Sequence, residues 1–247
     1  MSVTVPAAQA ERARALMIEL FPEGFEEVDQ DGGVELAAYT DAGGEERLWA
    51  AFGGARSDDV EEGWEDRWRA FHRPVVAGGL WIGPPWEPPL EGVPRVVVDP
   101  GRAFGTGAHP TTRACIELLA GLERGSCLDA GCGSGVVAVA AARLGFAPVL
   151  AVDVDPAAVE AASATARLNE VAVEIRLADV LRDPLPESDL VVANIELGVV
   201  EELLATVTAK MALTSGYLAH EAPSAQRWER RARLELEGWA ADVLAAL

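Results

Sequence analysis

The sequence is almost without lysine. Lys210 is the only lysine, and the other 19 of the 20 basic side chains are arginines. Against them stand 40 carboxylates, which give a formal net charge of −20 at pH 7. A surface of this sign repels phosphate backbones, so we expect no direct binding to nucleic acid.

The sequence is also poor in cysteine and in long apolar runs. Cys115, Cys127 and Cys132 form no C-x-x-C pair, which argues against a zinc site and against redox chemistry. We interpret them as small buried apolar side chains in a reducing compartment. No run of about 18 uncharged apolar residues is present, so no membrane-spanning segment is expected. The first 20 residues lack the pattern of a secretory signal, which favours a cytoplasmic location.

Composition divides the chain into three segments. Residues 1–70 carry six arginines and 17 carboxylates, and we expect them to form a small α+β domain. Residues 71–94 are rich in proline and glycine, which predicts a linker that is rigid and extended over 74–94. Residues 95–247 form the second domain. The acidic charge of the first domain is typical of a solvated surface, although it also suits a docking face for a basic protein.

Hydrophobic periodicity predicts the elements of both domains. In the first domain we expect strands over 2–5, 25–28 and 34–39 and helices over 8–21, 45–52 and 64–71. In the second domain we expect strands over 96–98, 127–129, 149–152, 173–177 and 190–193, helices over 111–122, 136–144, 156–169 and 199–209, and an antiparallel pair over 230–236 and 239–247. Strands that alternate with helices predict an α/β fold with a mostly parallel, doubly wound sheet and an antiparallel C-terminal strand.

A glycine-rich turn follows the strand over 127–129. It reads Asp129-Ala130-Gly131-Cys132-Gly133-Ser134-Gly135 and opens the helix over 136–144. Such glycines allow a tight turn and let a ligand approach the backbone at a helix N-terminus. The spacing does not match the dinucleotide fingerprint, and no Gly-Lys-Ser/Thr follows to make a P-loop. A tight strand–helix corner without a ligand is the alternative interpretation.

Polar side chains end the next three predicted strands. Asp153 lies 22 residues after Gly131, the position of a carboxylate that binds a ribose diol. Asp179 would lie beside the adenine of a bound nucleoside, and Asn194 would lie at the carboxyl edge of the sheet. Each of them could instead be a cap or turn residue. We interpret Asp155 as the N-cap of the helix over 156–169.

The order and spacing of these residues resemble those of class I S-adenosylmethionine-dependent methyltransferases. The stretch Asp99–Thr112, DPGRAFGTGAHPTT, resembles a loop of the ribosomal protein L-eleven (L11) methyltransferase family, PrmA. Val192-Ala193-Asn194-Ile195 and Gly63–Arg69 resemble further signatures of that family. The resemblance implies a Rossmann-like class I methyltransferase sheet and an N-terminal domain that recognises the substrate.

The resemblance also implies an activity and a set of site residues. The activity is transfer of methyl groups from S-adenosylmethionine to the N-terminal amine and lysine side chains of a protein, ribosomal protein L11. Asn194 would orient the acceptor amine, and no metal ion is implied. His109 could act as a base, although we favour a role in loop architecture. The residues implied to bind the cofactor are Phe104, Thr106, Thr112, Asp129, Gly131, Gly133, Asp153, Asp179 and Asn194.

Two departures from the family pattern concern the substrate. Residues 213–221 lack the Pro-Gly-Gly turn, and residues 222–247 leave hardly any room for a helix before the antiparallel pair. The N-terminal domain also looks abbreviated. We expect cofactor binding to survive these changes. The alternatives are therefore a methyltransferase of another basic protein or of a small amine, and a non-catalytic S-adenosylmethionine-binding protein. A nucleic-acid methyltransferase is disfavoured by the charge and by the absence of an Asn-Pro-Pro-Tyr pattern.

Overall fold

The chain forms two compact units, Met1–Asp66 and Arg67–Leu247. The computed structural model describes residues 2–6, 26–30, 33–38, 42–54, 72–99 and 107–247, together with residues 9, 13, 16, 17, 20 and 21. Within that part of the chain, no helix is long and apolar enough to cross a membrane.

The first unit contains a three-stranded antiparallel sheet and a helix. The strands are β1 (Ser2–Pro6), β2 (Glu26–Gln30) and β3 (Gly33–Ala37), in the order β1-β3-β2, and the helix is α2 (Ala42–Phe52). These elements confirm the predicted strands and the helix over 45–52 to within a few residues. The predicted helix over 64–71 lies outside the described residues.

Alternating side chains build the core of the first unit. Val3 and Val5 of β1 and Leu36 of β3 point to the same buried cluster, where they meet Met17 and Leu48. The residues described within the predicted helix over 8–21 include the four whose spacing predicted it, and all four are helical: Ala13, Leu16, Met17 and Leu20. The unit thus has a hydrophobic core of its own.

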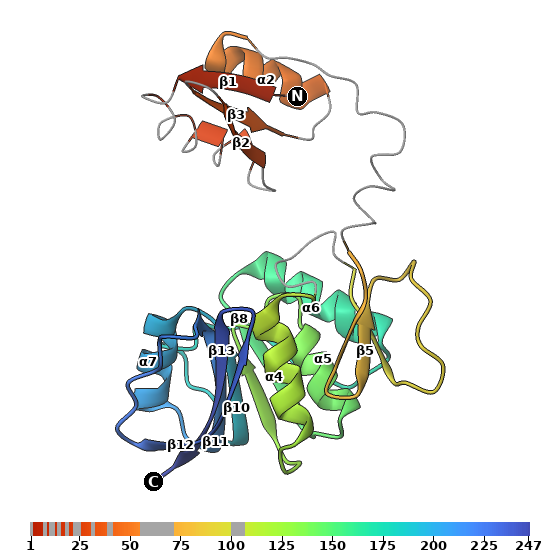
Figure 1. Ribbon diagram of the computed structural model, residues 1–247, viewed down its shortest axis with the longest axis vertical. Helices are drawn as coiled ribbons and strands as arrows, with labels where there is room; N and C mark the ends of the chain where they lie inside the picture. The colour runs from red at the N-terminus through yellow and green to blue at the C-terminus, as the bar shows by residue number, and fades with distance from the viewer. Residues whose placement is uncertain are drawn as a thin grey trace. The chain divides into compact units, whose positions relative to one another are not determined.

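The second unit is built on a seven-stranded sheet with the order β12-β13-β11-β10-β7-β8-β9 (Figure 1). The five strands from β11 to β9 are parallel, β13 is antiparallel to β11, and β12 is antiparallel to β13. The predicted α/β sheet with an antiparallel C-terminal strand is confirmed. The strands are β7 (Cys127–Ala130), β8 (Val149–Asp153), β9 (Glu174–Leu177), β10 (Ser188–Asn194), β11 (Ala209–Leu218), β12 (Trp228–Leu236) and β13 (Trp239–Ala246).

Helices cover both faces of this sheet. Side chains of α4 (Pro110–Ala120), α5 (Val136–Arg143) and α6 (Pro156–Leu168) pack on one face, and those of α7 (Leu197–Thr206) pack on the other (Figure 1). Neighbouring strand residues alternate between the faces, as period-two geometry requires. The prediction of a helix over 199–209 is wrong at its end. The helix stops at Thr206, and Ala209 already starts β11, a strand that the sequence analysis missed.

Residues 74–94 differ from the extended connector predicted for them. β4 (Val75–Ala77) and β5 (Leu80–Gly83) pair antiparallel, and β6 (Arg95–Val97) pairs parallel with β5. Leu80, Trp81 and Ile82 are buried, so this small sheet belongs with the second unit. The Gly78 N–H donates to Glu117 of α4 at 2.6 Å. This segment forms strands despite its prolines and glycines, because removing the apolar side chains of its short strands from water is favourable.

Asn169, which follows α6, fastens β6 to the rest of the unit. Its side chain is 2% exposed and pairs with the backbone of Val97 as a neighbouring strand would. The carboxamide oxygen accepts from the Val97 N–H at 2.8 Å, and the amide nitrogen donates to the Val97 oxygen at 2.7 Å. The same nitrogen also donates to the Thr165 oxygen at 2.8 Å.

Asn169→Ala should therefore destabilise the second unit. It leaves a buried N–H and a buried carbonyl of Val97 without partners, at a cost of about 3 kcal/mol in the free energy of unfolding. Urea unfolding followed by tryptophan fluorescence measures this loss. Asn169→Asp is the comparison. It keeps the acceptor for the Val97 N–H but sets a buried carboxylate against the Val97 and Thr165 oxygens, so at pH 7 it should lose at least as much stability as the alanine variant. An alanine variant within about 0.5 kcal/mol of the parent would contradict the assignment.

Candidate functional site

A cavity of about 610 Å³ opens at the carboxyl ends of the parallel strands. This is the edge at which open α/β sheets bind their ligands, and the volume is typical of a small-molecule site. Four structural features line the cavity: the glycine-rich turn after β7, the start of α4, the end of β10, and the residues Gly216 and Trp239 of β11 and β13.

The glycine-rich turn needs its glycines. Gly131, Gly133 and Gly135 have φ values of 76°, 51° and 76°, a region that side chains with a Cβ rarely adopt. A Cβ on Gly131 would lie 2.5 Å from Cγ2 of Ile195, and one on Gly135 would lie 2.8 Å from Cβ of Ala162. Gly135 is the N-cap of α5 and offers no side chain to the helix start, where the Ala138 N–H of the first turn donates to the Asp129 carboxylate.

Asp129 lines the cavity with a carboxylate that is incompletely satisfied. The residue is 2% exposed, and its Oδ2 has no hydrogen-bond partner. Burial raises the pKa of Asp129 to about 7, against a hydrogen bond from the Ala138 backbone that lowers it, and the charge of Asp153 raises it further. A buried oxygen of this kind suits a positively charged ligand group, which would restore the ionised form.

Two predicted site residues, Asn194 and Thr112, meet at the wall of the cavity. Asn194 ends β10, and its amide nitrogen donates to the Thr112 hydroxyl of α4 at 3.3 Å. His109 is the N-cap of α4, and its Nδ1 lies 2.8 Å from the Thr111 hydroxyl. Its ring packs edge-on against Trp239, with 5.0 Å between the centroids. Nδ1 also accepts from the Thr111 N–H, so His109 caps the helix, and its role in loop architecture stays a prediction.

Asp153 and Asp179 are not among the residues that line the cavity. The Asp153 carboxylate accepts from the Gly133 N–H at 2.8 Å and from the Asp155 N–H at 3.0 Å, so it buttresses the glycine-rich turn. Asp179 closes a turn by accepting from the Leu181 N–H at 2.9 Å. Their contacts with a nucleoside stay predictions. Phe104 and Thr106 lie outside the described residues.

Gly216 and Trp239 are cavity residues from segments to which the sequence analysis assigned no role in the site. Gly216 sits near the end of β11, in the string Ser215-Gly216-Tyr217, and follows the short apolar run Met211-Ala212-Leu213 by three residues. Trp239 starts β13 and reaches the cavity only because the β12–β13 hairpin folds back beside α4. No local pattern predicts that placement.

The strand order, the glycine-rich turn after the central strand β7 and the polar residues at the strand ends define a class I, Rossmann-like methyltransferase fold. A solved structure of ribosomal protein L11 methylase from Lactobacillus delbrueckii subsp. bulgaricus shares this fold. It has a TM-score of 0.64 at 23% identity, over 71% of this chain and 99% of that one. The chain belongs to the ribosomal protein L11 methyltransferase (PrmA) family, whose model matches residues 28–239.

Curated relatives carry the same family name. The ribosomal protein L11 methyltransferase of Symbiobacterium thermophilum is 43% identical over 164 residues, which are 64% of this chain and 54% of the relative. That of Chromohalobacter salexigens is 38% identical over 202 residues, which are 73% of this chain and 66% of the relative. The chain thus spans about half of the first relative's length and about two thirds of the second's.

The cavity fits S-adenosylmethionine in size and in chemistry. The amino-acid part of this cofactor has an ammonium and a carboxylate, and its sulfur is cationic. The unpartnered Oδ2 of Asp129 matches a positive group of the cofactor. The glycines of the turn leave the backbone open to close approach.

Proposed function

We propose that this protein transfers methyl groups from S-adenosylmethionine to amino groups of ribosomal protein L11 in the cytoplasm. The observation that carries the proposal is the cavity itself. It brings the orphaned Asp129 carboxylate, the glycine-rich turn and the Asn194–Thr112 pair around one space. Family membership supports the substrate, because the relatives are named for methylation of ribosomal protein L11.

The cofactor would be held by the turn and by the strand ends. Asp129, Gly131 and Gly133 would hold its amino-acid part, and Asp153 and Asp179 its ribose and adenine. Asn194 would lie near the methyl donor, and Thr112 would contact the cofactor at the start of α4. Phe104 and Thr106 would belong to the loop that closes over the cofactor. No metal ion is needed for this assignment. Among the described residues, no His, Cys, Asp and Glu side chains form a metal-binding group.

The protein's contribution is positioning and desolvation. The bound cofactor supplies a methyl group already activated on a sulfonium, so the transfer is governed by how the acceptor is aligned. A lysine amine must lose its proton before it attacks, and a partly enclosed cavity favours the neutral form. Asn194 would aim the lone pair of the amine. Glu196, exposed at the same cavity, would attract the protonated amine on its approach.

The decisive test is to incubate the full chain with S-adenosylmethionine and ribosomal protein L11 and to read the product by intact-mass spectrometry. We expect stepwise mass gains of one methyl each. If L11 gains no mass while calorimetry still shows cofactor binding, the substrate is another basic protein or a small amine. If the cofactor is bound and no acceptor is ever methylated, the protein is a non-catalytic binder.

Asp153→Ala tests the cofactor assignment. We expect its affinity for S-adenosylmethionine to fall by about 1–3 kcal/mol, because a ribose contact is lost and the Gly133 N–H loses its acceptor. Isothermal calorimetry measures the change. Asp155→Ala is the control. It removes the N-cap that accepts from the Ala157 N–H and should destabilise α6 by about 1 kcal/mol without weakening cofactor binding. Equal affinities of Asp153→Ala and the parent would rule out the assignment.

A further inference from the structure

The end of β11 is irregular where it borders the cavity. Its pairing with β13 shifts register between Ser215 and Tyr217, which makes Gly216 the extra residue of a β-bulge. Gly216 has φ +102° and lines the cavity. A Cβ on Gly216 would overlap the Ile195 carbonyl, so the backbones of the two residues lie in direct contact. Bulges beside functional sites commonly redirect neighbouring groups.

The bulge sets the position of Ile195, the residue after Asn194. The Ile195 N–H donates to the Ser215 oxygen at 3.2 Å. On its other side, the Ile195 side chain rests on Gly131 of the glycine-rich turn. Ile195 is therefore held between the bulge and the turn, and a shift of the bulge would move the end of β10 that carries Asn194.

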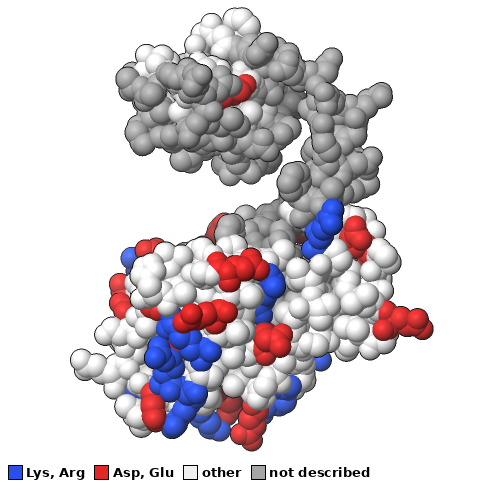
Figure 2. Space-filling view, viewed as in Figure 1, with Lys and Arg blue, Asp and Glu red and all other residues white. Residues whose placement is uncertain are grey.

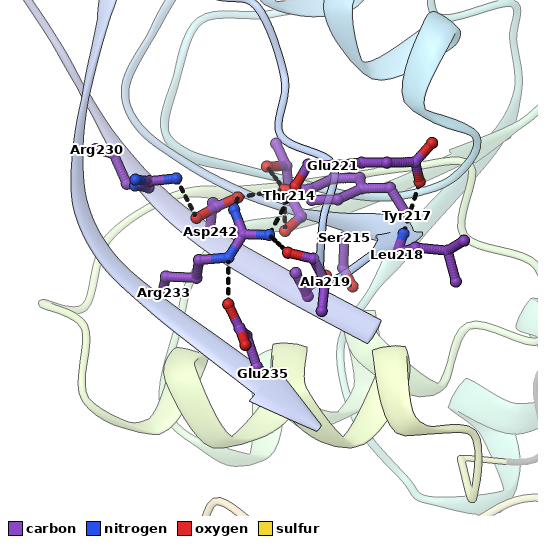
Figure 3. A network of polar contacts seen from close by, with 11 residues as sticks. Thr214, Ser215, Tyr217, Leu218, Ala219, Glu221, Arg230, Arg233, Glu235 and Asp242 are labelled. Carbon is purple, nitrogen blue, oxygen red and sulfur yellow. Dashed lines mark hydrogen bonds and ion pairs between the residues drawn. The ribbon is translucent and has the colours of Figure 1, made fainter. Parts of the chain in front are cut away.

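Tyr217 follows the bulge directly, and its hydroxyl belongs to a network of polar contacts (Figure 3). Its side chain is 2% exposed, and its hydroxyl lies 2.9 Å from Oδ2 of Asp242 and 2.8 Å from the Thr214 hydroxyl. The Tyr217 hydroxyl has one proton and gives it to the carboxylate, while the Thr214 hydroxyl can donate to the tyrosine oxygen. The hydroxyl is thus satisfied in both directions, which fixes the ring in place.

Arg233 of β12 completes this network. It donates to Oδ2 of Asp242 at 3.2 Å, and to the carbonyl oxygens of Ala219 and Glu221 at 2.8 and 2.6 Å. Thr214, Asp242 and Arg233 are register partners on adjacent strands, so they lie side by side on the α7 face of the sheet. Figure 2 shows Lys and Arg side chains gathered where β12 lies in Figure 1.

The network lies beside a connection that contains no helix. Residues 219–227, which connect β11 to β12, contain turns and no helix, as the short C-terminal segment predicts. Arg233 joins this connection to β13, because it donates both to carbonyl oxygens of the connection and to the fully buried Asp242 carboxylate. Asp242 thus links the β12–β13 hairpin, through Arg233, to Tyr217 beside the bulge.

We propose that Tyr217 is a positioning residue for the acceptor end of the cavity. Its hydroxyl fixes the Gly216 bulge, and the bulge sets Ile195 and Asn194. The inference rests on the proposed function, since it assigns Asn194 to the acceptor amine. If Tyr217 only stabilised the hairpin, its loss would lower the unfolding temperature and leave the geometry at Ile195 unchanged.

The test compares two conservative variants that each remove one buried hydrogen-bonding group from the full chain. Tyr217→Phe removes the hydroxyl bonded to Asp242 and Thr214. Trp228→Phe removes an indole N–H that donates to the Leu204 oxygen at 2.8 Å, away from the cavity. We expect kcat for methyl transfer to fall about tenfold in Tyr217→Phe with the cofactor Kd within twofold of the parent. Trp228→Phe should keep both values.

Amide hydrogen exchange gives a readout that does not depend on activity. We expect the Ile195 amide to exchange about tenfold faster in Tyr217→Phe and at the parent rate in Trp228→Phe. Thr214→Val, which removes the other partner of the hydroxyl, should change exchange in the same direction. Unchanged Ile195 exchange in Tyr217→Phe, or equal losses of kcat in Tyr217→Phe and Trp228→Phe, would overturn the proposal. A parent that methylates no L11 refutes the proposed function, and the exchange experiment still decides the role of Tyr217.

Discussion

A chain that begins at Arg67 should bind S-adenosylmethionine as tightly as the full chain and transfer no measurable methyl to ribosomal protein L11. All described residues that line the cavity lie between His109 and Trp239, within the second unit. The first unit closes a core of its own around Met17, Leu36 and Leu48. Its removal should therefore leave the cofactor site intact.

The loss of transfer follows from the charge of the first unit. Residues 1–70 carry 17 carboxylates and six arginines, a distribution that steers and orients a basic partner. Without them, ribosomal protein L11 loses both the steering and the docking face that would hold its amines at the cavity.

Two measurements on the truncated chain separate these effects. Calorimetry should give a cofactor Kd within about twofold of the full chain, and circular dichroism should report the same α/β content for the second unit. Intact-mass spectrometry should then show unmodified L11. If the truncated chain methylates L11 at the full rate, the first unit is not a docking domain. If its cofactor affinity falls more than about tenfold, the first unit contributes to the site.

The parallel part of the sheet could be predicted because its signals are local. Each buried strand ends in a turn residue or a polar residue, and each helix shows its own period. β11 was missed for a physical reason. Both of its faces are covered, so Ala209–Leu218 shows no clean alternation, and its last residues resemble a Ser-Gly loop. The strands β4 and β5 were missed because they are stabilised by pairing and by packing on α4, which no local window contains.

The candidate site divides in the same way. Thr112, Asp129 and Asn194 were found because each belongs to a contiguous motif at a strand end or a helix start. Gly216 and Trp239 reach the cavity through a bulge and a hairpin, so their positions depend on pairing among β11, β12 and β13. Asp179 is different, because the contact that the structure shows for it is local: its carboxylate accepts from the Leu181 N–H in a turn.

Asp129→Asn should stabilise the cofactor-free protein while it weakens cofactor binding. Folding keeps the Asp129 carboxyl protonated up to about pH 7, because burial raises its pKa from 3.8 to about 7. In the unfolded chain the same group ionises near its ordinary value. The folded state therefore loses stability as the pH rises from about 4 to about 7, and the loss stays constant above that.

Asparagine does not titrate, and its oxygen can still accept from the Ala138 N–H. The variant should therefore match the parent below about pH 4 and exceed it above pH 7, by at most on the order of 4 kcal/mol in the free energy of unfolding. Scanning calorimetry of the cofactor-free proteins at pH 5 and pH 8 measures the difference. Asp153→Asn is the control. Both Asp153 oxygens accept backbone N–H groups, so this variant should lose stability.

Cofactor affinity should respond in the opposite direction. A positive group of the cofactor near Oδ2 favours the ionised carboxylate, so binding releases a proton wherever the free protein still holds one. The parent should therefore bind S-adenosylmethionine more weakly as the pH falls below 7, by up to about tenfold per pH unit. Asp129→Asn should bind weakly and show no such slope between pH 6 and pH 8. A parent whose affinity is flat over this range, or a variant that melts below the parent at pH 8, would show that Asp129 is not the unsatisfied carboxylate that the cofactor neutralises.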